Sequence, residues 1–284
     1  EIVRLIDFRY LTDALKPEEA LEILENSSAD KKNRLSILMD EGYPCYNTSA
    51  GWLGYSDEKL YELCVKAKKS GFSHLKFKVG KDLNDDIRRL KIARKALGTD
   101  VRIMIDANQV WEVDEAIEWI KELEFADPFF IEEPTSPDDI AGHKKIKDAI
   151  QPIKVATGEM CQNRIIFKQF IQDNALDIVQ IDSCRIGGLN EILSVLLLAH
   201  KYDKPVWPHA GGVGLCEYVQ HIAMIDYLLI SCEKNSKRIE YVDHLHEHFL
   251  NPCKVKAGKY SAPLNPGFSI EMKNETLTNY LYSD

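Results

Sequence analysis

The sequence predicts an α/β protein, a barrel of parallel strands surrounded by helices. Short apolar runs rich in β-branched residues alternate with longer amphipathic stretches along most of the 284 residues. Such alternation is typical of parallel strands joined by helical crossovers. Seven ionisable residues stand at or just after the ends of successive runs, at intervals of 23 to 31 residues. A strand–helix unit has this length, and about 250 residues complete an eightfold barrel.

The apolar runs define the expected strands in order. They cover residues 2–8, 74–79, 101–106, 129–132, 153–157, 177–181, 204–208 and 238–241. Helices are expected at 57–69, 83–97, 113–123, 162–172, 189–201 and 217–227. Because each strand leads to the next through one helix, a TIM-type barrel is favoured over a doubly wound sheet. We expect residues 1–250 to form the barrel domain, and residues 251–284, where the rhythm is lost, to form an extended segment.

Composition excludes several classes of function. The net charge of −9 argues against a nucleic-acid partner, and no apolar run reaches the roughly 18–20 residues of a membrane span. The seven cysteines contain no CxxC pair, so neither a disulfide framework nor a structural zinc site is expected. Free thiols fit a reducing, intracellular compartment, mitochondrial or cytoplasmic. The composition does not exclude a homo-oligomer.

Three carboxylates at successive strand ends point to a metal. Asp106, Glu132 and Glu159 would meet at one mouth of the barrel, where they repel one another unless a cation lies between them. Oxygen ligands without Cys or His suit Mg²⁺. The alternative is that these groups pair with lysines or arginines at the rim. Glu133, which follows Glu132, faces the other side and leaves the choice between them open; Asn108 shares the face of Asp106 and could bind substrate.

Lys76 and Lys78 in "LKFKVG" share one face of the next strand, because side chains alternate along a strand. A nearby divalent cation favours a neutral amine. A lysine here could therefore have its pKa lowered to about 7–8 and act as a base. The alternative is a pair of lysines in salt bridges with rim acids.

Asp182 and His209 stand at neighbouring strand ends. A carboxylate that accepts a hydrogen bond from one imidazole nitrogen leaves the other free to exchange protons. A competing site is "DHLHEHF" at 243–249, where His244, His246 and His248 alternate as zinc ligands can. That motif follows the last predicted strand, and its histidines do not stand at strand ends as the other site residues do. We therefore expect it to have a structural role.

Together these groups suit the removal of a proton next to a carboxylate. Mg²⁺ with a Lys or His base is the arrangement that stabilises an ene-diolate in the enolase superfamily. The sequence resembles the mandelate racemase subgroup of that superfamily: "LKFKVG" resembles its KxK motif, and "IDAN", "IEEP" and "TGE" its metal-ligand strand ends. "IDSCRIGG" and "PHAGG" resemble its Asp/His dyad. "IEEPTSPDD", "HAGGVGLCE" and "EYVDHLHEHF" resemble the L-fuconate dehydratases, and the resemblance covers the whole chain.

The resemblance implies a (β/α)7β barrel and a sugar-acid dehydratase. Asp106, Glu132 and Glu159 would bind Mg²⁺, which favours Glu132 over Glu133. The resemblance also implies that Lys78 is the base at C2, and that Lys76 contacts the substrate carboxylate and lowers the pKa of Lys78. His209, oriented by Asp182, would be the acid at the 3-hydroxyl. Glu240, Asn108 and Glu159 would help to hold the substrate.

The chain departs from this family at its beginning. Family members start with a capping domain of more than 100 residues that closes the barrel mouth, and here that domain is largely missing. Residues 251–284 would normally pack against it. Without that domain, the chain would be either a fragment or a barrel without catalytic activity that binds or supports a partner. A racemase or epimerase that uses the same site is a separate alternative that stays open.

Overall fold

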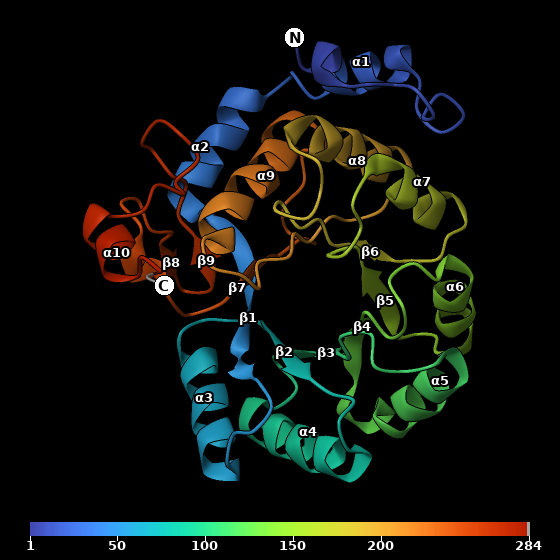
Figure 1. Cartoon of the computed structure of the whole chain (residues 1–284), viewed down its shortest axis with the longest axis vertical. Helices are drawn as coiled ribbons and strands as arrows, with labels where there is room; N and C mark the ends of the chain where they lie inside the picture. Colours follow the sequence, from blue (N-terminus) through green and yellow to red (C-terminus); the bar gives the residue numbers. More distant parts are fainter. Residues whose placement is uncertain (283–284) are drawn as a thin grey trace.

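The computed structural model describes residues 1–282 and confirms the barrel (Figure 1). Its strands are β1 Tyr43–Gly51, β2 His74–Lys78, β3 Arg102–Asp106, β4 Pro128–Glu132, β5 Lys154–Thr157, β6 Ile178–Val179, β7 Ile239–Tyr241, β8 Val255–Lys256 and β9 Lys259–Tyr260. Its α-helices are α1 Pro17–Asn26, α2 Lys31–Glu41, α3 Asp57–Lys69, α4 Leu83–Leu97, α5 Val113–Glu122, α6 Ile140–Ala149, α7 Arg164–Gln172, α8 Leu189–Lys201, α9 Leu215–Leu229 and α10 Asn274–Asn279. Short 3-10 helices are η1 Ile2–Leu5, η2 Glu124–Ala126 and η3 His246–His248.

The strands close into a ring of eight positions. β1 to β6 pair in parallel in chain order, and β7 pairs in parallel with the other edge of β1. The gap between β6 and β7 is filled by the extended residues 204–208, where Val206 bridges to Val179 and the Pro208 carbonyl accepts from the backbone N–H of Glu240 at 3.2 Å. Seven helices, α3 to α9, connect these positions and surround them (Figure 1). The architecture is therefore the expected (β/α)7β barrel.

The expectation of a first strand at residues 2–8 was wrong. Ile2–Leu5 is a 3-10 helix, and Ile6 packs in a hydrophobic cluster with residues of α7 and α8, outside the ring of strands. A strand needs a neighbouring strand to satisfy its backbone hydrogen bonds, and the faces of helices offer none. The apolar residues of this segment are buried by packing alone.

The true first strand is β1, which the hydrophobic pattern did not reveal. Its sequence, YPCYNTSAG, contains proline, asparagine, serine and glycine, which are depleted in strands. The strand forms because both of its edges are paired, with β2 on one side and β7 on the other. Gly51 has no side chain where β1 crosses β2: a Cβ there would lie 2.0 Å from the Lys76 carbonyl oxygen. Tertiary pairing has overridden a weak local preference.

A layer of apolar side chains fills the barrel below the mouth. It consists of Tyr46, Met104, Phe130, Ala156, Ile178 and Trp207, one from each of six strand positions. Trp207 lies against the rings of Tyr46, Phe129 and Phe130, with centroid distances of 5.5 to 6.0 Å. The interior is thus a packed core, as is usual in such barrels, and polar groups collect at the strand ends above it.

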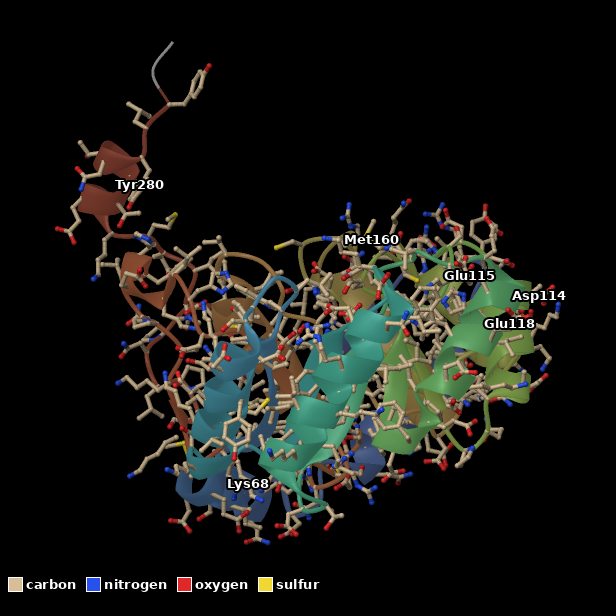
Figure 2. All side chains as sticks on the ribbon, turned by 90° about the horizontal axis from the view of Figure 1, so that it is seen from below. Lys68, Asp114, Glu115, Glu118, Met160 and Tyr280 are labelled. Carbon is tan, nitrogen blue, oxygen red and sulfur yellow. The ribbon has the colours of Figure 1, made fainter. Side chains whose placement is uncertain are left out.

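The C-terminal segment is more ordered than an extended tail. β8 and β9 form an antiparallel hairpin, and β9 pairs with the start of β1 through Tyr43 and Tyr260. Figure 2 shows α10 and Tyr280 projecting beyond the barrel, on the side of Met160 and opposite Lys68. Met160 follows Glu159, so this is the mouth side. The last two residues of the segment lie outside the described part of the chain. Among residues 1–282, no helix has the length and apolar character needed to cross a membrane.

Candidate active site

The predicted site residues gather at the carboxyl ends of the strands. Lys76 and Lys78 lie on β2, Asp106 and Glu132 end β3 and β4, Glu240 lies in β7, and Glu159, Asp182 and His209 follow β5, β6 and the strand position 204–208. The register of the parallel pairs aligns Lys78 with Asp106 and Asp106 with Glu132. The sheet therefore brings residues from separate units of the chain to one mouth, as the strand-end pattern predicted.

Lys76 is buried among three carboxylates. Its Nζ lies 2.7 Å from Glu132 Oε1, 3.0 Å from Glu240 Oε1 and 3.1 Å from Asp106 Oδ2, and the side chain is only 1% exposed. Burial opposes the charged form of the ammonium. The carboxylates of Glu132, Glu240 and Asp106 outweigh burial and hold the pKa of Lys76 well above its ordinary value. The lysine therefore stays charged and offsets acids that would otherwise repel.

Lys78 lies nearer to solvent on the same face. Its Nζ is 2.6 Å from Asp106 Oδ2, and its side chain is 27% exposed. Asp106 thus contacts both lysines. Burial would raise the pKa of Asp106, but the charges of Lys76 and Lys78 lower it to about 2. Of the two lysines, Lys78 is the one that a molecule entering the mouth can reach.

Glu132 is the acid with the least compensation. Gln180 Nε2 donates to Glu132 Oε2 at 2.7 Å, and Lys76 contacts both carboxylate oxygens. Burial and the neighbouring charge of Asp106 nevertheless raise the pKa of Glu132 to about 8. A further positive charge at this position would favour its ionised form.

His209 and Asp182 form the expected dyad. Asp182 Oδ2 lies 2.7 Å from His209 Nδ1, and Oδ1 accepts from the backbone N–H groups of Cys184 and Arg185. Burial lowers the pKa of His209, but the charge of Glu240 and the hydrogen bond with Asp182 outweigh it and raise the pKa to about 10. The imidazole is therefore protonated near neutral pH, with Nε2 aimed into the mouth.

The third candidate metal ligand, Glu159, faces the dyad. Its Oε2 lies 3.1 Å from His209 Nε2 but has no hydrogen-bond partner with suitable geometry. Among residues 1–282, the carboxylate oxygens of Asp106, Glu132 and Glu159 do not all lie within 4.8 Å of one another. Lys76 Nζ lies between the first two, and the third contacts His209.

Glu133 and Asn108 lie outside this network. Glu133 is buried, and its Oε2 accepts from Gln109 Nε2 at 2.7 Å, away from the contacts of Glu132. Burial raises the pKa of Glu133 to about 7. Asn108 is exposed and has φ 46°; its backbone N–H donates to Asp106 Oδ1 at 3.1 Å. The peptide of Asn108 therefore supports Asp106, while its side chain is exposed to solvent.

Sequence reasoning missed two residues that support Lys76 and Glu132. Gln180 stands two residues before Asp182, so the period of two in "VQID" could have placed it on the same face. The ring of Tyr46, whose centroid is 5.6 Å from Lys76 Nζ, belongs to β1 and was hidden with that strand. Gln180 was missed because it is polar but uncharged, and Tyr46 was missed because its strand was not predicted.

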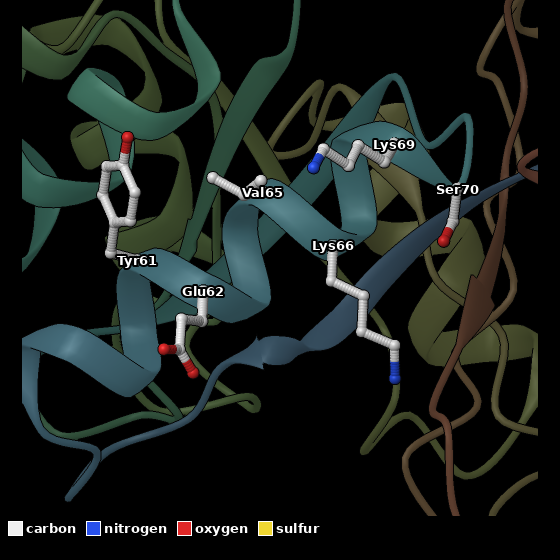
Figure 3. A pocket seen from close by; sticks show the side chains of 6 residues that line it. All are labelled: Tyr61, Glu62, Val65, Lys66, Lys69 and Ser70. Carbon is white, nitrogen blue, oxygen red and sulfur yellow. The ribbon is translucent and has the colours of Figure 1, made fainter.

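A separate pocket of about 390 Å³ lies on the outer surface of α3, lined by Tyr61, Glu62, Val65, Lys66, Lys69 and Ser70 (Figure 3). These residues belong to the C-terminal half of α3. Because α3 runs antiparallel to the strands, this half lies at the end of the barrel opposite the mouth, near Lys68 in Figure 2. The pocket is thus separate from the residues described above.

Comparisons with known proteins identify the family of the barrel. Residues 59–276 match the family described as enolase C-terminal domain-like. The crystal structure of human mitochondrial enolase superfamily member 1 is 52% identical, with a TM-score of 0.97 over 99% of this chain and 64% of that one. L-galactonate dehydratase of Hypocrea jecorina is 53% identical over 99% of this chain and 63% of its own length. The chain therefore spans less than two thirds of these relatives.

A more distant structure carries ligands. L-talarate dehydratase of Polaromonas sp. JS666, complexed with Mg and L-glucarate, is 25% identical, with a TM-score of 0.73 over 90% of this chain and 70% of that one. The match to the family covers more than half of the chain, and the barrel agrees with it. The chain belongs to the enolase superfamily, as a member of its C-terminal-domain family.

Proposed function

We propose that this chain is the catalytic barrel of a Mg²⁺-dependent sugar-acid dehydratase, a hydro-lyase that acts on L-fuconate. The observation that carries the proposal is the dyad: His209 Nδ1 lies 2.7 Å from Asp182, and Nε2 faces the acids at the mouth, where Lys76 and Lys78 also lie. A relative of 53% identity is named as a dehydratase of a sugar acid. That the whole protein has dehydratase activity is part of this proposal.

The residues present fit Mg²⁺. Asp106, Glu132 and Glu159 offer only oxygen ligands, which suit a hard cation. The buried mouth holds an excess of acids over lysines, and Glu159 Oε2 has no hydrogen-bond partner within residues 1–282. We assign these three carboxylates as the Mg²⁺ ligands. When bound, Mg²⁺ supplies positive charge that stabilises the anion formed when a proton leaves the carbon next to a carboxylate.

The protein groups divide the work around the substrate. Lys76, charged and buried, faces the substrate carboxylate. Lys78 is the base that accepts the proton from C2. His209, protonated and oriented by Asp182, donates a proton to the 3-hydroxyl, which leaves as water as the C3–O bond breaks. The electron pair from the C2–H bond forms the C2–C3 double bond, and the enol becomes a 2-keto-3-deoxy acid. Glu240, which accepts from the Ala210 N–H at 2.8 Å, and Asn108 are assigned to hold the substrate.

L-fuconate is the 6-deoxy form of L-galactonate, so the two acids share their configuration at C2 and C3. The chemistry at these carbons is therefore the same for both, and only C6 separates them. We assign L-fuconate as the preferred substrate, and the comparison of kcat/KM for the two acids tests that choice. The name of the human relative includes the word mitochondrial, and we propose a mitochondrial location for this protein as well.

The C-terminal segment, residues 251–284, is assigned as the docking surface of a capping domain. Leu277, Tyr280 and Leu281 are 53%, 73% and 77% exposed, and α10 projects beyond the barrel on the mouth side (Figure 2). Apolar side chains exposed together in this way indicate a surface that another domain covers.

The test is the reaction of the purified protein with Mg²⁺ and L-fuconate in D₂O. Formation of the 2-keto-3-deoxy acid with loss of water supports the proposal. Deuterium at C2 with inversion, and no loss of water, would show a racemase or epimerase instead. The absence of both reactions with L-fuconate and L-galactonate, in a folded protein that binds Mg²⁺, would overturn the enzymatic proposal in favour of a binding role.

Matched variants test the assigned roles. Lys78→Ala should abolish C2 proton exchange, while Lys81→Ala, on the exposed loop that follows β2, should not. His209→Asn should retain C2 exchange but lose dehydration, because the base is intact and the acid is missing. If Lys78→Ala still dehydrates L-fuconate, the mechanism is wrong even where the activity is right.

A further inference from the structure

The three histidines of "DHLHEHF" do not act as a unit. The His244 ring packs against Trp52 with a centroid distance of 5.6 Å. His248 Nδ1 lies 3.2 Å from Thr276 Oγ1, and its ring packs against Tyr280. Their rings have different neighbours, so a zinc site built from the alternation, the competing site of the sequence, does not form. His246 lies against α9, where it contacts Glu217.

The ring of His246 is held in one orientation. Nε2 lies 2.8 Å from the Val242 carbonyl oxygen, which can only accept, so Nε2 carries a proton. Nδ1 then faces Glu217 Oε1 at 2.7 Å and Cys253 Sγ at 3.6 Å. An imidazole whose far nitrogen donates to a backbone carbonyl is the usual arrangement of a histidine that ligates a metal through its near nitrogen.

Three potential ligands meet at this point, and a fourth lies beside them. One ligand atom each from Glu217, His246 and Cys253 lie within 4.8 Å of one another. Cys216 lies beside this group, and its Sγ accepts from the Val242 N–H at 3.5 Å, on the residue whose carbonyl oxygen faces His246. Cys216 and Glu217 are 2% and 1% exposed. A salt bridge between Glu217 and His246 alone would not require two thiols at the same place.

We propose that Cys216, Glu217, His246 and Cys253 form a binding site for one Zn²⁺ ion. Two thiolates, an imidazole and a carboxylate are a donor set that zinc binds tetrahedrally, and four protein ligands leave no open position. The site is therefore structural rather than catalytic. Mg²⁺, assigned to the barrel mouth, prefers oxygen ligands and does not compete for thiolates. On binding, the two thiols release their protons to solvent.

An ion can reach the site. A pocket of about 540 Å³ is lined by Cys253 and its neighbours Pro252 and Lys254, together with Gln220 on α9. A path from solvent is one requirement of a metal site, and this pocket supplies it next to a ligand.

The position of the site connects three segments. Cys216 and Glu217 begin α9, His246 lies in η3, and Cys253 belongs to the C-terminal segment. The S–H of Cys216 also points to the Ala210 carbonyl oxygen at 3.8 Å, one residue after His209. Zn²⁺ would therefore fasten the C-terminal segment to the barrel directly behind the loop of the dyad. This inference goes beyond the proposed dehydratase and does not depend on it.

The test is zinc binding by the purified, reduced protein in excess Mg²⁺, followed by elemental analysis. We expect one Zn²⁺ per chain. Replacement by Co²⁺ should produce the absorption of thiolate-to-cobalt charge transfer. Cys253→Ser and His246→Gln should each lose both signals, whereas His248→Gln and Cys232→Ser, the matched controls, should retain them.

A second measurement avoids dependence on the folding of variants. In the unsubstituted protein, Zn²⁺ should protect Cys216 and Cys253 from alkylation, as identified by peptide mapping, and leave Cys232 unprotected. Zinc that binds without charge transfer, or binding that survives both ligand substitutions, would overturn the proposal. So would the absence of zinc binding, or a disulfide between Cys216 and Cys253 in the protein as isolated under reducing conditions. None of these readouts depends on dehydratase activity.

Discussion

Lys76 and Lys78 share one face of β2 but differ in environment: Lys76 is 1% exposed and touches three carboxylates, whereas Lys78 is 27% exposed and touches one. The register of β2 and β3 produces this difference, because it aligns Lys76 with Met104 in the apolar layer and Lys78 with Asp106 at the mouth. The two lysines should respond differently to substitution.

Lys76→Met should destabilise the fold by about 3–5 kcal/mol, because it leaves buried carboxylates without their cation. Lys78→Met is the matched control. Its partly exposed lysine pairs with one acid, so its loss should cost about 1 kcal/mol or less. Urea unfolding at neutral pH without Mg²⁺ measures both. Equal losses of stability in the two variants would contradict the difference in environment.

Asp182→Asn should lower kcat for dehydration by roughly 10²–10⁴-fold, because it removes the group that orients His209. It should also move the alkaline limb of the pH profile to lower pH. The sign follows from the raised pKa of His209, about 10, to which the hydrogen bond with Asp182 contributes. When that pKa falls, the protonated imidazole is lost at lower pH. A pH profile that keeps its shape while kcat falls would contradict the contribution of Asp182 to the raised pKa of His209.

Glu132→Gln should weaken Mg²⁺ binding strongly, as measured by calorimetry, whereas Glu133→Gln should leave it nearly unchanged. The two residues are adjacent, but the carboxylate of Glu132 contacts Lys76 and that of Glu133 contacts Gln109. Removal of Mg²⁺ by a chelator should abolish dehydration, and added Mg²⁺ should restore it. Equal affinities in the two variants would remove Glu132 from the proposed ligands.

His74 makes the fold sensitive to acid. Burial lowers its pKa from 6.5 to about 3, with the charges of Arg238 and Arg102 adding to the effect. Between these values the unfolded chain binds a proton that the folded protein does not, so stability falls as pH falls from about 6.5 toward 3.

His74→Phe keeps an aromatic ring against Phe129 and Trp207 but cannot titrate. The free energy of unfolding of the natural protein should fall more steeply than that of the variant between pH 6 and 4, by up to about 1.4 kcal/mol per pH unit. Urea unfolding at each pH measures the difference. Parallel pH profiles would show that His74 does not carry this dependence.

Helices were predictable where a long amphipathic pattern has clear ends. The predicted ranges for α3, α4 and α8 agree with the structure at both ends. α3 begins after Ser56, whose side chain accepts from the Lys59 N–H, and α4 ends just before Gly98, which has φ 68°. Local capping and the helical period determine such boundaries, and both can be read from the chain. The helices α1, α2, α6 and α10 were missed.

The sequence by itself determined the class of the barrel and the residue types at its mouth, because strand period and unit length set which side chains stand at strand ends. It could not determine β1, whose residues favour strand only when both edges are paired. It also could not bring Cys253 to Glu217 and His246, or select His246 from three alternating histidines. Those contacts join segments far apart in the chain, and only the packing of α9, η3 and the C-terminal segment decides them.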